Sequence, residues 1–379
     1  MIRSAYIHIP FCEHICHYCD FNKMFLKGQP VDEYLFALEK EMQLALKMNP
    51  TDQLHTIFVG GGTPTSLNES QLKLLCTMIE KNLPYQNDVE FTFEANPGDL
   101  SIEKLKILHT YGVNRISFGV QSFNEELLKK IGRTHKPSDV YDSIENAQKA
   151  GFHNISIDLI YGLPGQTLED FHITLQKALE IGLPHYSGYS LIVEPKTVFY
   201  NLMQKGKLNL PPQEIEAQMY ELLMEKMDQH GLHQYEISNF AKKDFESRHN
   251  LTYWNNEEYY GFGAGAHGYV NGMRVANYGP LKKYMEPISL GNLPYIEKHK
   301  VSDMERMEEE MFLGLRKTSG VELAAFEKKF GQSLTELFKE QMIDLTKRGL
   351  ITIDNGSLKL THKGKLLGNE VFGSFIGVI

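Results

Sequence analysis

Short runs of β-branched and aromatic residues alternate with amphipathic segments through the first half of the chain. The segment 31–48 shows the helical period, with Tyr34, Leu38 and Met42 along one stripe. Strands and helices in strict alternation predict a parallel sheet with right-handed crossovers. The predicted strands are 5–9, 56–59, 89–94, 115–120, 154–161 and 186–192. The predicted helices between them are 32–48, 69–82, 102–111, 138–150 and 168–181.

Six strands are fewer than the eight of a closed β/α barrel. The predicted fold class is therefore α/β, with a partial, open (β/α)6 barrel over residues 1–205. Residues 206–300 are predicted to extend the barrel, beginning with a helix at 213–229 that could complete the sixth unit. An acidic, aromatic and glycine-rich stretch follows from 235 to 278.

The last part of the chain, residues 301–379, has a different pattern. Helical patterns at 303–316, 322–330 and 334–348 precede two short strand patterns. These strands are joined at Asn355-Gly356, a pair typical of tight hairpin turns. Helices followed by a hairpin predict a small C-terminal winged-helix-like α+β domain.

Composition and charge exclude several classes of protein. The 379 residues include 39 Lys and Arg against 48 Asp and Glu, for a net charge of −9 without a basic cluster. This balance argues against nucleic-acid binding, which rests on basic side chains that contact phosphates. No apolar run reaches the ~18–20 residues that cross a bilayer, and the first residues do not resemble a signal peptide. We expect a cytoplasmic protein with no membrane span and no nucleic-acid partner.

The cysteines point to metal chemistry. Cys12, Cys16 and Cys19 have the spacing C-x3-C-x2-C and directly follow the first predicted strand. Thiolates are soft ligands that suit zinc, copper(I) and iron–sulfur clusters. On a [4Fe–4S] cluster, three thiolates leave one iron free for a ligand from outside the protein.

The cysteines also allow a zinc site, and one of the four cysteines is predicted to have no role in metal binding. A structural zinc ion could be bound by the three cysteines with His14 or His17 as fourth ligand. Such a protein would be colourless, whereas a thiolate-bound iron–sulfur cluster absorbs visible light. The fourth cysteine, Cys76, stands alone in an apolar helical pattern and is predicted to be a core residue.

A glycine-rich turn narrows the alternatives. Gly60-Gly61-Gly62-Thr63-Pro64 follows the second predicted strand, and glycines there let a ligand approach the backbone closely. Together with the cysteine spacing, this turn resembles the radical S-adenosylmethionine (SAM) superfamily. The resemblance implies a [4Fe–4S] cluster held by Cys12, Cys16 and Cys19, with SAM bound at the open iron.

Further motifs resemble the HemN/HemW family within that superfamily. They are YIHIPFC, GGGTPT, FEANPG, SFGVQSF, IGRTH, IDLIYGLPGQ and GFGAGAHG, from residue 6 to about 270. Several of their polar residues lie at the ends of predicted strands, where β/α barrels place their active sites. By motif, the resemblance implies SAM contacts from Tyr6, Tyr18, Gly61, Gly62, Thr63, Glu94, Gln121, Arg133 and Asp158.

Two features distinguish the branches of this family. Decarboxylating HemN enzymes carry a fourth cysteine where this chain has Phe21, and they have a longer segment before the cluster than the eleven residues here. The chain is therefore more similar to the HemW branch. That resemblance implies a haem chaperone that delivers haem to apo-proteins, with respiratory clients expected. The alternative is an enzyme, an oxygen-independent coproporphyrinogen III oxidase of porphyrin biosynthesis, because the cluster and SAM residues are all present.

A last motif concerns haem itself. The run 249–254, HNLTYW, resembles the H-N-x-x-Y-W element associated with haem binding in the HemW branch, which implies haem contacts from His249, Asn250, Tyr253 and Trp254. A neutral imidazole is a common axial ligand of haem iron, and aromatic rings pack against a porphyrin. A homodimer that depends on the cluster is a further hypothesis, because the cysteine loop is expected at an exposed barrel mouth.

Overall fold

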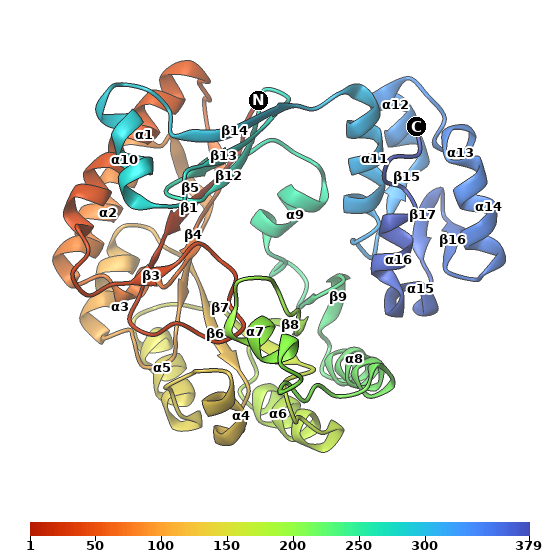
Figure 1. Ribbon diagram of the computed structural model, residues 1–379, viewed down its shortest axis with the longest axis horizontal. Coiled ribbons are helices and arrows are strands. Elements are labelled where there is room, and N and C mark those ends of the chain that lie inside the picture. Colours follow the sequence, from red (N-terminus) through yellow and green to blue (C-terminus); the bar gives the residue numbers. More distant parts are fainter.

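A computed structural model describes residues 1–379 and contains a nine-stranded sheet in the order β11-β1-β4-β5-β6-β7-β8-β10-β9 (Figure 1). The predicted parallel sheet and α/β class are confirmed, since neighbouring strands from β1 to β8 in this order pair in parallel. The six strands are β1 Ser4–Ile9, β4 Leu54–Gly61, β5 Tyr85–Ala95, β6 Arg115–Gln121, β7 Asn154–Tyr161 and β8 His185–Ser190.

The sheet extends beyond the six predicted strands at both edges. β11 (Tyr260–Phe262) pairs in parallel with β1, although it comes much later in the chain. At the other edge, β10 (Asn239–Ala241) and β9 (His233–Glu236) pair antiparallel. These strands are too short to show a period in the sequence, and only pairing with the sheet stabilises them. β11 and β9 remain at opposite edges, so the barrel is open.

Helices cover the outer face of the sheet (Figure 1). The stripe on the first of them is confirmed, because Tyr34, Leu38 and Met42 are fully buried in a core that runs along the whole barrel. None of the helices combines the length and the apolar character that crossing a membrane requires. The barrel helices are α1 Val31–Met48, α2 Glu69–Asn82, α3 Ile102–Thr110, α4 Glu125–Lys130, α5 Pro137–Lys149, α6 Leu168–Glu180, α7 Val198–Gln204 and α8 Gln213–Gln229.

The stretch that contains HNLTYW is partly helical. Helix α9 (Arg248–Trp254) begins after Ser247, whose hydroxyl accepts a hydrogen bond from the Asn250 amide. The Glu90 carboxylate on β5 also accepts from the amides of Arg248 and His249, at 2.8 and 2.9 Å. A carboxylate at a helix N-terminus satisfies free N–H groups. The carboxylate comes from a strand far away in the sequence, so the local pattern does not reveal it.

Two further elements complete this region. A three-stranded antiparallel sheet consists of β12 (His267–Val270), β13 (Met273–Asn277) and β14 (Tyr295–Lys300). Helix α10 (Leu281–Ser289) connects the last two strands and packs against α1. The short strands β2 (Phe11–Cys12) and β3 (Met24–Phe25) pair near the start of the chain.

The C-terminal elements surround a second hydrophobic core of 15 buried residues. The predicted helices and hairpin are present, but the last helical segment is divided at Phe338 and the hairpin gains a third strand. The elements are α11 Asp303–Gly314, β15 Val321–Glu322, α12 Leu323–Phe330, α13 Leu334–Leu337, α14 Lys339–Lys347, β16 Ile351–Asp354, β17 Ser357–Leu360, α15 His362–Leu366 and α16 Gly368–Gly373.

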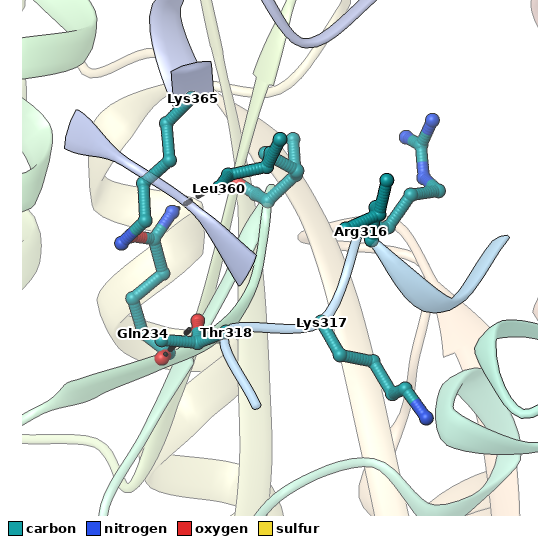
Figure 2. Close-up of a pocket in the computed structure, with 8 residues that line it drawn as sticks. Gln234, Arg316, Lys317, Thr318, Leu360 and Lys365 are labelled. Carbon is teal, nitrogen blue, oxygen red and sulfur yellow. Dashed lines mark hydrogen bonds between the residues drawn. The ribbon is translucent and has the colours of Figure 1, made fainter. Parts of the chain in front are cut away.

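The C-terminal elements contact the barrel at edge strand β9 (Figure 2). The Lys365 ammonium donates to the side-chain carbonyl of Gln234 at 2.7 Å, and the Thr318 hydroxyl donates to the Gln234 backbone carbonyl at 2.7 Å. The Ile237 amide, just beyond β9, donates to the Arg316 carbonyl at 3.0 Å. The cavity between these residues measures only about 10 Å³, room for a single water molecule. This contact is a structural junction.

Glu41 on α1 joins three elements and supports a prediction about stability. Its buried carboxylate accepts hydrogen bonds from the Gly263 amide at 2.8 Å, from the Asn277 side chain at 2.6 Å and from the Tyr284 hydroxyl at 2.5 Å. Burial raises the pKa of Glu41 to about 7, although these hydrogen bonds lower it. The folded protein therefore binds a proton at pH values where the unfolded chain has already released it.

We expect the stability contribution of Glu41 to fall as the pH rises from its unfolded pKa, near 4.5, through about 7. Glu41→Gln keeps a neutral hydrogen-bonding group, so its unfolding free energy should depend less on pH. Denaturant unfolding of both proteins at about pH 5 and about pH 8 measures this difference. Parallel pH profiles for the two proteins would contradict the assignment.

Candidate cluster and cofactor site

The three cysteines of the loop lie at the mouth of the barrel. Cys12 ends β2, directly after β1, and the Leu26 amide donates to its carbonyl at 2.9 Å, which closes the base of the loop. His17 anchors the far side, with Nδ1 hydrogen bonded to the Lys130 carbonyl at 2.8 Å. Cys12, Cys16 and Cys19 are all free thiols and line the same cavity.

This cavity has a volume of about 400 Å³ and opens at the carboxyl ends of the parallel strands, as expected for β/α barrels. It brings the predicted cluster ligands together with every predicted SAM residue except Tyr6. Tyr6 lines a second cavity, which adjoins the first at Asp20, Phe21 and Lys23. The predicted residues that line the cavity with the cysteines are Tyr18, Gly61, Gly62, Thr63, Glu94, Gln121, Arg133 and Asp158.

Burial raises the pKa of two of the thiols, Cys12 and Cys19. Burial raises the pKa of Cys12 to about 11, although the Thr63 hydroxyl, 3.7 Å from its sulfur, lowers it. Burial also raises the pKa of Cys19, against the effect of the nearby Lys23 ammonium. Thiols in this environment stay protonated until a positively charged metal centre binds them as thiolates.

The glycines at the end of β4 are required by their surroundings. Gly61 has φ +112°, and a Cβ atom there would lie 2.4 Å from the His8 ring. A Cβ atom on Gly62 would lie 2.8 Å from the Phe11 carbonyl oxygen. The Gly61 amide donates to Glu94 Oε2 at 3.0 Å. The turn therefore presents bare backbone to the cavity, close to the cysteine loop.

Two carboxyl groups line the interior of the cavity. Burial raises the pKa of Glu94 to about 7, and the charge of Asp158 raises it further. Burial also raises the pKa of Asp158, whose carboxylate accepts a hydrogen bond from the Ser117 hydroxyl at 3.2 Å. Gln121, at the end of β6, has φ +65°, which turns the chain at the cavity edge. These groups can hydrogen bond the hydroxyls of a ribose.

Arg133 supplies the cation of the cavity. Its guanidinium donates to the Asn96 side-chain carbonyl and, at 3.3 Å, to the Tyr18 hydroxyl. Its buried Nε atom has no hydrogen-bond partner. A buried donor without a partner is costly, and only neutral groups accept hydrogen bonds from this guanidinium, so the carboxylate of a ligand suits it as a partner.

The residues present fit the two groups that the sequence resemblance implies. Three thiols in one loop provide three ligands to a cluster, and the cation, the carboxylates and the bare backbone suit an amino acid joined to a nucleoside. The zinc alternative would use the same three thiols but would leave the cation, the carboxylates and the bare backbone of this cavity without a role.

The predicted haem residues do not share one cavity. His249 is 1% exposed, and its Nδ1 and Nε2 are hydrogen bonded to the Thr56 and Tyr253 hydroxyls, at 2.8 and 2.7 Å. Burial lowers the pKa of His249 to about 3, so its ring is neutral. Trp254 instead packs under the Arg316 guanidinium, 4.5 Å from its ring centre. Of these four predicted residues, only Tyr253 lines one of the larger cavities.

Sequence reasoning missed several residues that line the cluster cavity. Asn96, which holds Arg133, lies in the FEANPG motif, so the motif itself could have indicated it. Ser117 and Tyr189 lie on β6 and β8 and face the cavity. Alternation along these two strands is the signal that could have found them, because inward and outward positions alternate.

Comparison with known proteins agrees with this geometry. The family model of the radical SAM superfamily matches residues 6–178, and the model of the HemN C-terminal domain matches residues 301–367. The heme chaperone HemW of Bacillus subtilis is 60% identical over 99% of this chain and 100% of its own length. The heme chaperone HemW of Lactococcus lactis is 50% identical over 99% of this chain and 97% of its own length.

A solved structure has the same fold throughout. The radical SAM enzyme coproporphyrinogen III oxidase (HemN) from Escherichia coli superposes with a TM-score of 0.86, over 100% of this chain and 91% of that one, at 25% identity. Radical SAM membership implies a [4Fe–4S] cluster and SAM as cofactors. The chain, similar over its full length to proteins named HemW, belongs to the HemW family of the radical SAM superfamily.

Proposed function

We propose that this protein is a haem chaperone that binds a [4Fe–4S] cluster, SAM and haem and passes haem to apo-proteins. The observation that carries the proposal is the high identity, over the full length, to proteins named heme chaperones. The site supports it, because cluster and SAM residues are complete while Phe21 occupies the position of the fourth HemN cysteine.

Cys12, Cys16 and Cys19 would hold the cluster, which supplies electrons and an open iron when bound. Arg133 would pair with the SAM carboxylate, because its guanidinium is buried and only neutral groups accept its hydrogen bonds. Glu94 and Asp158 would orient the ribose hydroxyls, and Gly61 and Gly62 would admit the methionine part close to the backbone. Tyr6, Tyr18, Thr63 and Gln121 complete the proposed SAM contacts.

We propose that His249 becomes an iron ligand when Tyr253 releases its Nε2 atom. The ring is already neutral, which is the form that binds iron. Tyr253 separates His249 from the second cavity, so rotation of the tyrosine would expose the imidazole to haem. Asn250 and Trp254 would support α9, since Trp254 packs against Arg316 of the C-terminal elements.

The test is an anaerobic haem titration of the full-length, cluster-reconstituted protein beside His249→Ala and His249→Gln. Both variants should bind haem about tenfold or more weakly. His249→Gln can still hydrogen bond Tyr253, so it separates loss of the iron ligand from loss of packing. A coproporphyrinogen turnover assay on the same samples should show no product. Turnover with SAM consumed, and no haem binding that depends on His249, would contradict the proposal.

Three further proposals concern the cellular location of the protein, its clients and its oligomeric state. We propose a cytoplasmic chaperone, since free thiols that ligate a cluster need a reducing compartment. We propose apo-haemoproteins of the respiratory chain as clients. We also propose a homodimer that forms only with the cluster in place, because Phe21 and Phe25 beside the cysteine loop are exposed apolar residues. Equal sizes of apo and reconstituted protein in solution would contradict it.

A further inference from the structure

The second cavity adjoins the cluster cavity. It has a volume of about 640 Å³, within the range of about 300–1,000 Å³ that is typical of ligand pockets. β1, the segment 20–23, the end of α9 and the segment 265–267 form its walls. Asp20, Phe21 and Lys23 line both cavities, so a ligand in the second cavity would lie beside the cluster.

His267 is the free imidazole of this cavity. His8 also lines it, but its Nδ1 is hydrogen bonded to the Tyr6 hydroxyl at 3.0 Å and its Nε2 to the Asn22 carbonyl at 2.7 Å. The His267 side chain is exposed and makes no hydrogen bond to the protein. Its two ring nitrogens are thus available to a metal ion, unlike those of His8 and His249.

The backbone holds His267 firmly although its ring is free. His267 begins β12 and pairs with Ala276 of β13. Its carbonyl oxygen packs so closely on Gly261 of β11 that a Cβ atom there would lie 1.8 Å away. A histidine whose backbone is already fixed loses little conformational entropy when it binds a metal ion, which favours affinity.

The other walls suit a flat apolar molecule that carries carboxylates. Phe21 is 59% exposed, and the rings of Tyr253 and Tyr259 pack edge to face 4.7 Å apart at the cavity wall. Two cations, Lys196 and Lys23, and one carboxylate, Asp20, line the cavity, and the Lys23 ammonium also donates a hydrogen bond to the Cys19 carbonyl. Aromatic rings pack well against a porphyrin, and the excess of positive charge favours propionates.

We propose that the second cavity is where this protein takes up haem, with His267 as the first iron ligand and Lys196 and Lys23 as partners of the propionates. Phe21 packs against the porphyrin and separates it from the cluster. This inference rests on the proposed function and names the site of haem entry. Tyr253 lies between the cavity and His249, so His249 can replace or join His267 only after Tyr253 moves.

The first test compares His267→Gly with wild type in full-length, cluster-reconstituted protein titrated with haem. The variant should bind haem about tenfold or more weakly and should lose the visible spectrum of imidazole-ligated haem. Added imidazole should restore that spectrum in the variant by occupying the vacated position. A merely structural role for His267 would not give this rescue. His299→Gly, an exposed histidine on β14 of the same small sheet, is the matched control and should bind like wild type.

The second test examines the lysines with a neutral ligand. Lys196→Gln should weaken haem binding by about threefold to tenfold, but should leave binding of haem dimethyl ester unchanged because that compound has no free propionates. Lys282→Gln, a lysine on α10, is the control and should change neither. Equal weakening for both compounds would overturn the assignment of Lys196.

The outcomes separate this inference from the proposed function. If wild-type protein shows no saturable haem binding, the proposed function fails and this inference fails with it. If wild type binds haem, His249→Ala does not, and His267→Gly binds normally, the entry site is wrong while the proposed function stands. Loss in His267→Gly with rescue by imidazole supports the entry site.

Discussion

Replacing Cys16 with alanine is expected to abolish the [4Fe–4S] cluster. The three thiols of the loop line one cavity, and each would hold one iron. Phe21 stands where a fourth cysteine could have served as a substitute ligand, and Cys76 is buried in the core away from the loop. Loss of one thiolate leaves two irons without a protein ligand, an arrangement that does not hold a cluster.

The measurement is iron and sulfide content with visible absorption after anaerobic reconstitution. Cys16→Ala should return background values, whereas Cys76→Ala should retain the full cluster and lose only core packing. Cys76 is therefore the matched control for the removal of a thiol. Stoichiometric iron and sulfide in Cys16→Ala would show that this residue is not a ligand.

Arg133→Leu is expected to weaken SAM binding about a hundredfold or more, as when a buried ion pair worth ~3 kcal/mol loses one partner. Arg133 lines the cluster cavity, and its buried Nε atom lacks a partner. In the proposed complex the carboxylate of SAM fills that position. Leucine keeps part of the volume but removes the charge and every donor.

Equilibrium dialysis with SAM and with decarboxylated SAM, on cluster-reconstituted protein, distinguishes charge pairing from general damage. Wild type should prefer SAM strongly, while Arg133→Leu should bind the two compounds about equally. Arg133→Lys should retain part of the preference because it keeps the charge. A preference for SAM that survives in Arg133→Leu would refute the pairing. Arg133 donates hydrogen bonds to Tyr18 and Asn96. Thermal unfolding of Arg133→Leu checks that the loss of these bonds does not destabilise the fold.

The two cavities give the site a defined arrangement. The first contains the proposed cluster ligands and most of the proposed SAM residues, and the second contains a free histidine, two lysines and several aromatic rings. Phe21 lies in the wall between them. Phe21 has two roles in the proposed function. It occupies the position of the fourth HemN cysteine, and its ring provides an apolar surface for a porphyrin.

Much of the barrel could be predicted from the sequence. The six parallel strands have hydrophobic patterns long enough to read, and the α1 stripe at Tyr34, Leu38 and Met42 lies in the core as its period indicates. β11 and β9 could not be predicted, because three or four residues show no period and become strands only by pairing with β1 and β10. The cap of α9 could not be predicted either, because Glu90, which accepts hydrogen bonds from the first amides of the helix, lies on a distant strand.

The sequence by itself determined the chemistry of the cysteine loop and the glycine turn. Cys12, Cys16 and Cys19 lie within eight residues, so their spacing alone limits which metal centre they can hold. Gly61 ends β4 and Gly62 follows it, at a strand end that must lie at the barrel mouth. Local spacing is sufficient in both places because few conformations connect the residues.

Only the tertiary structure decided which histidine is free. HNLTYW suggests an available imidazole, yet His249 is hydrogen bonded to Thr56, 193 positions away in the chain, and is buried against β4. His267 attracts little attention in the sequence but lies free in a cavity formed by β1, the cysteine loop and β12. Exposure and hydrogen bonding depend on contacts between distant segments, and a local motif contains no information about those contacts.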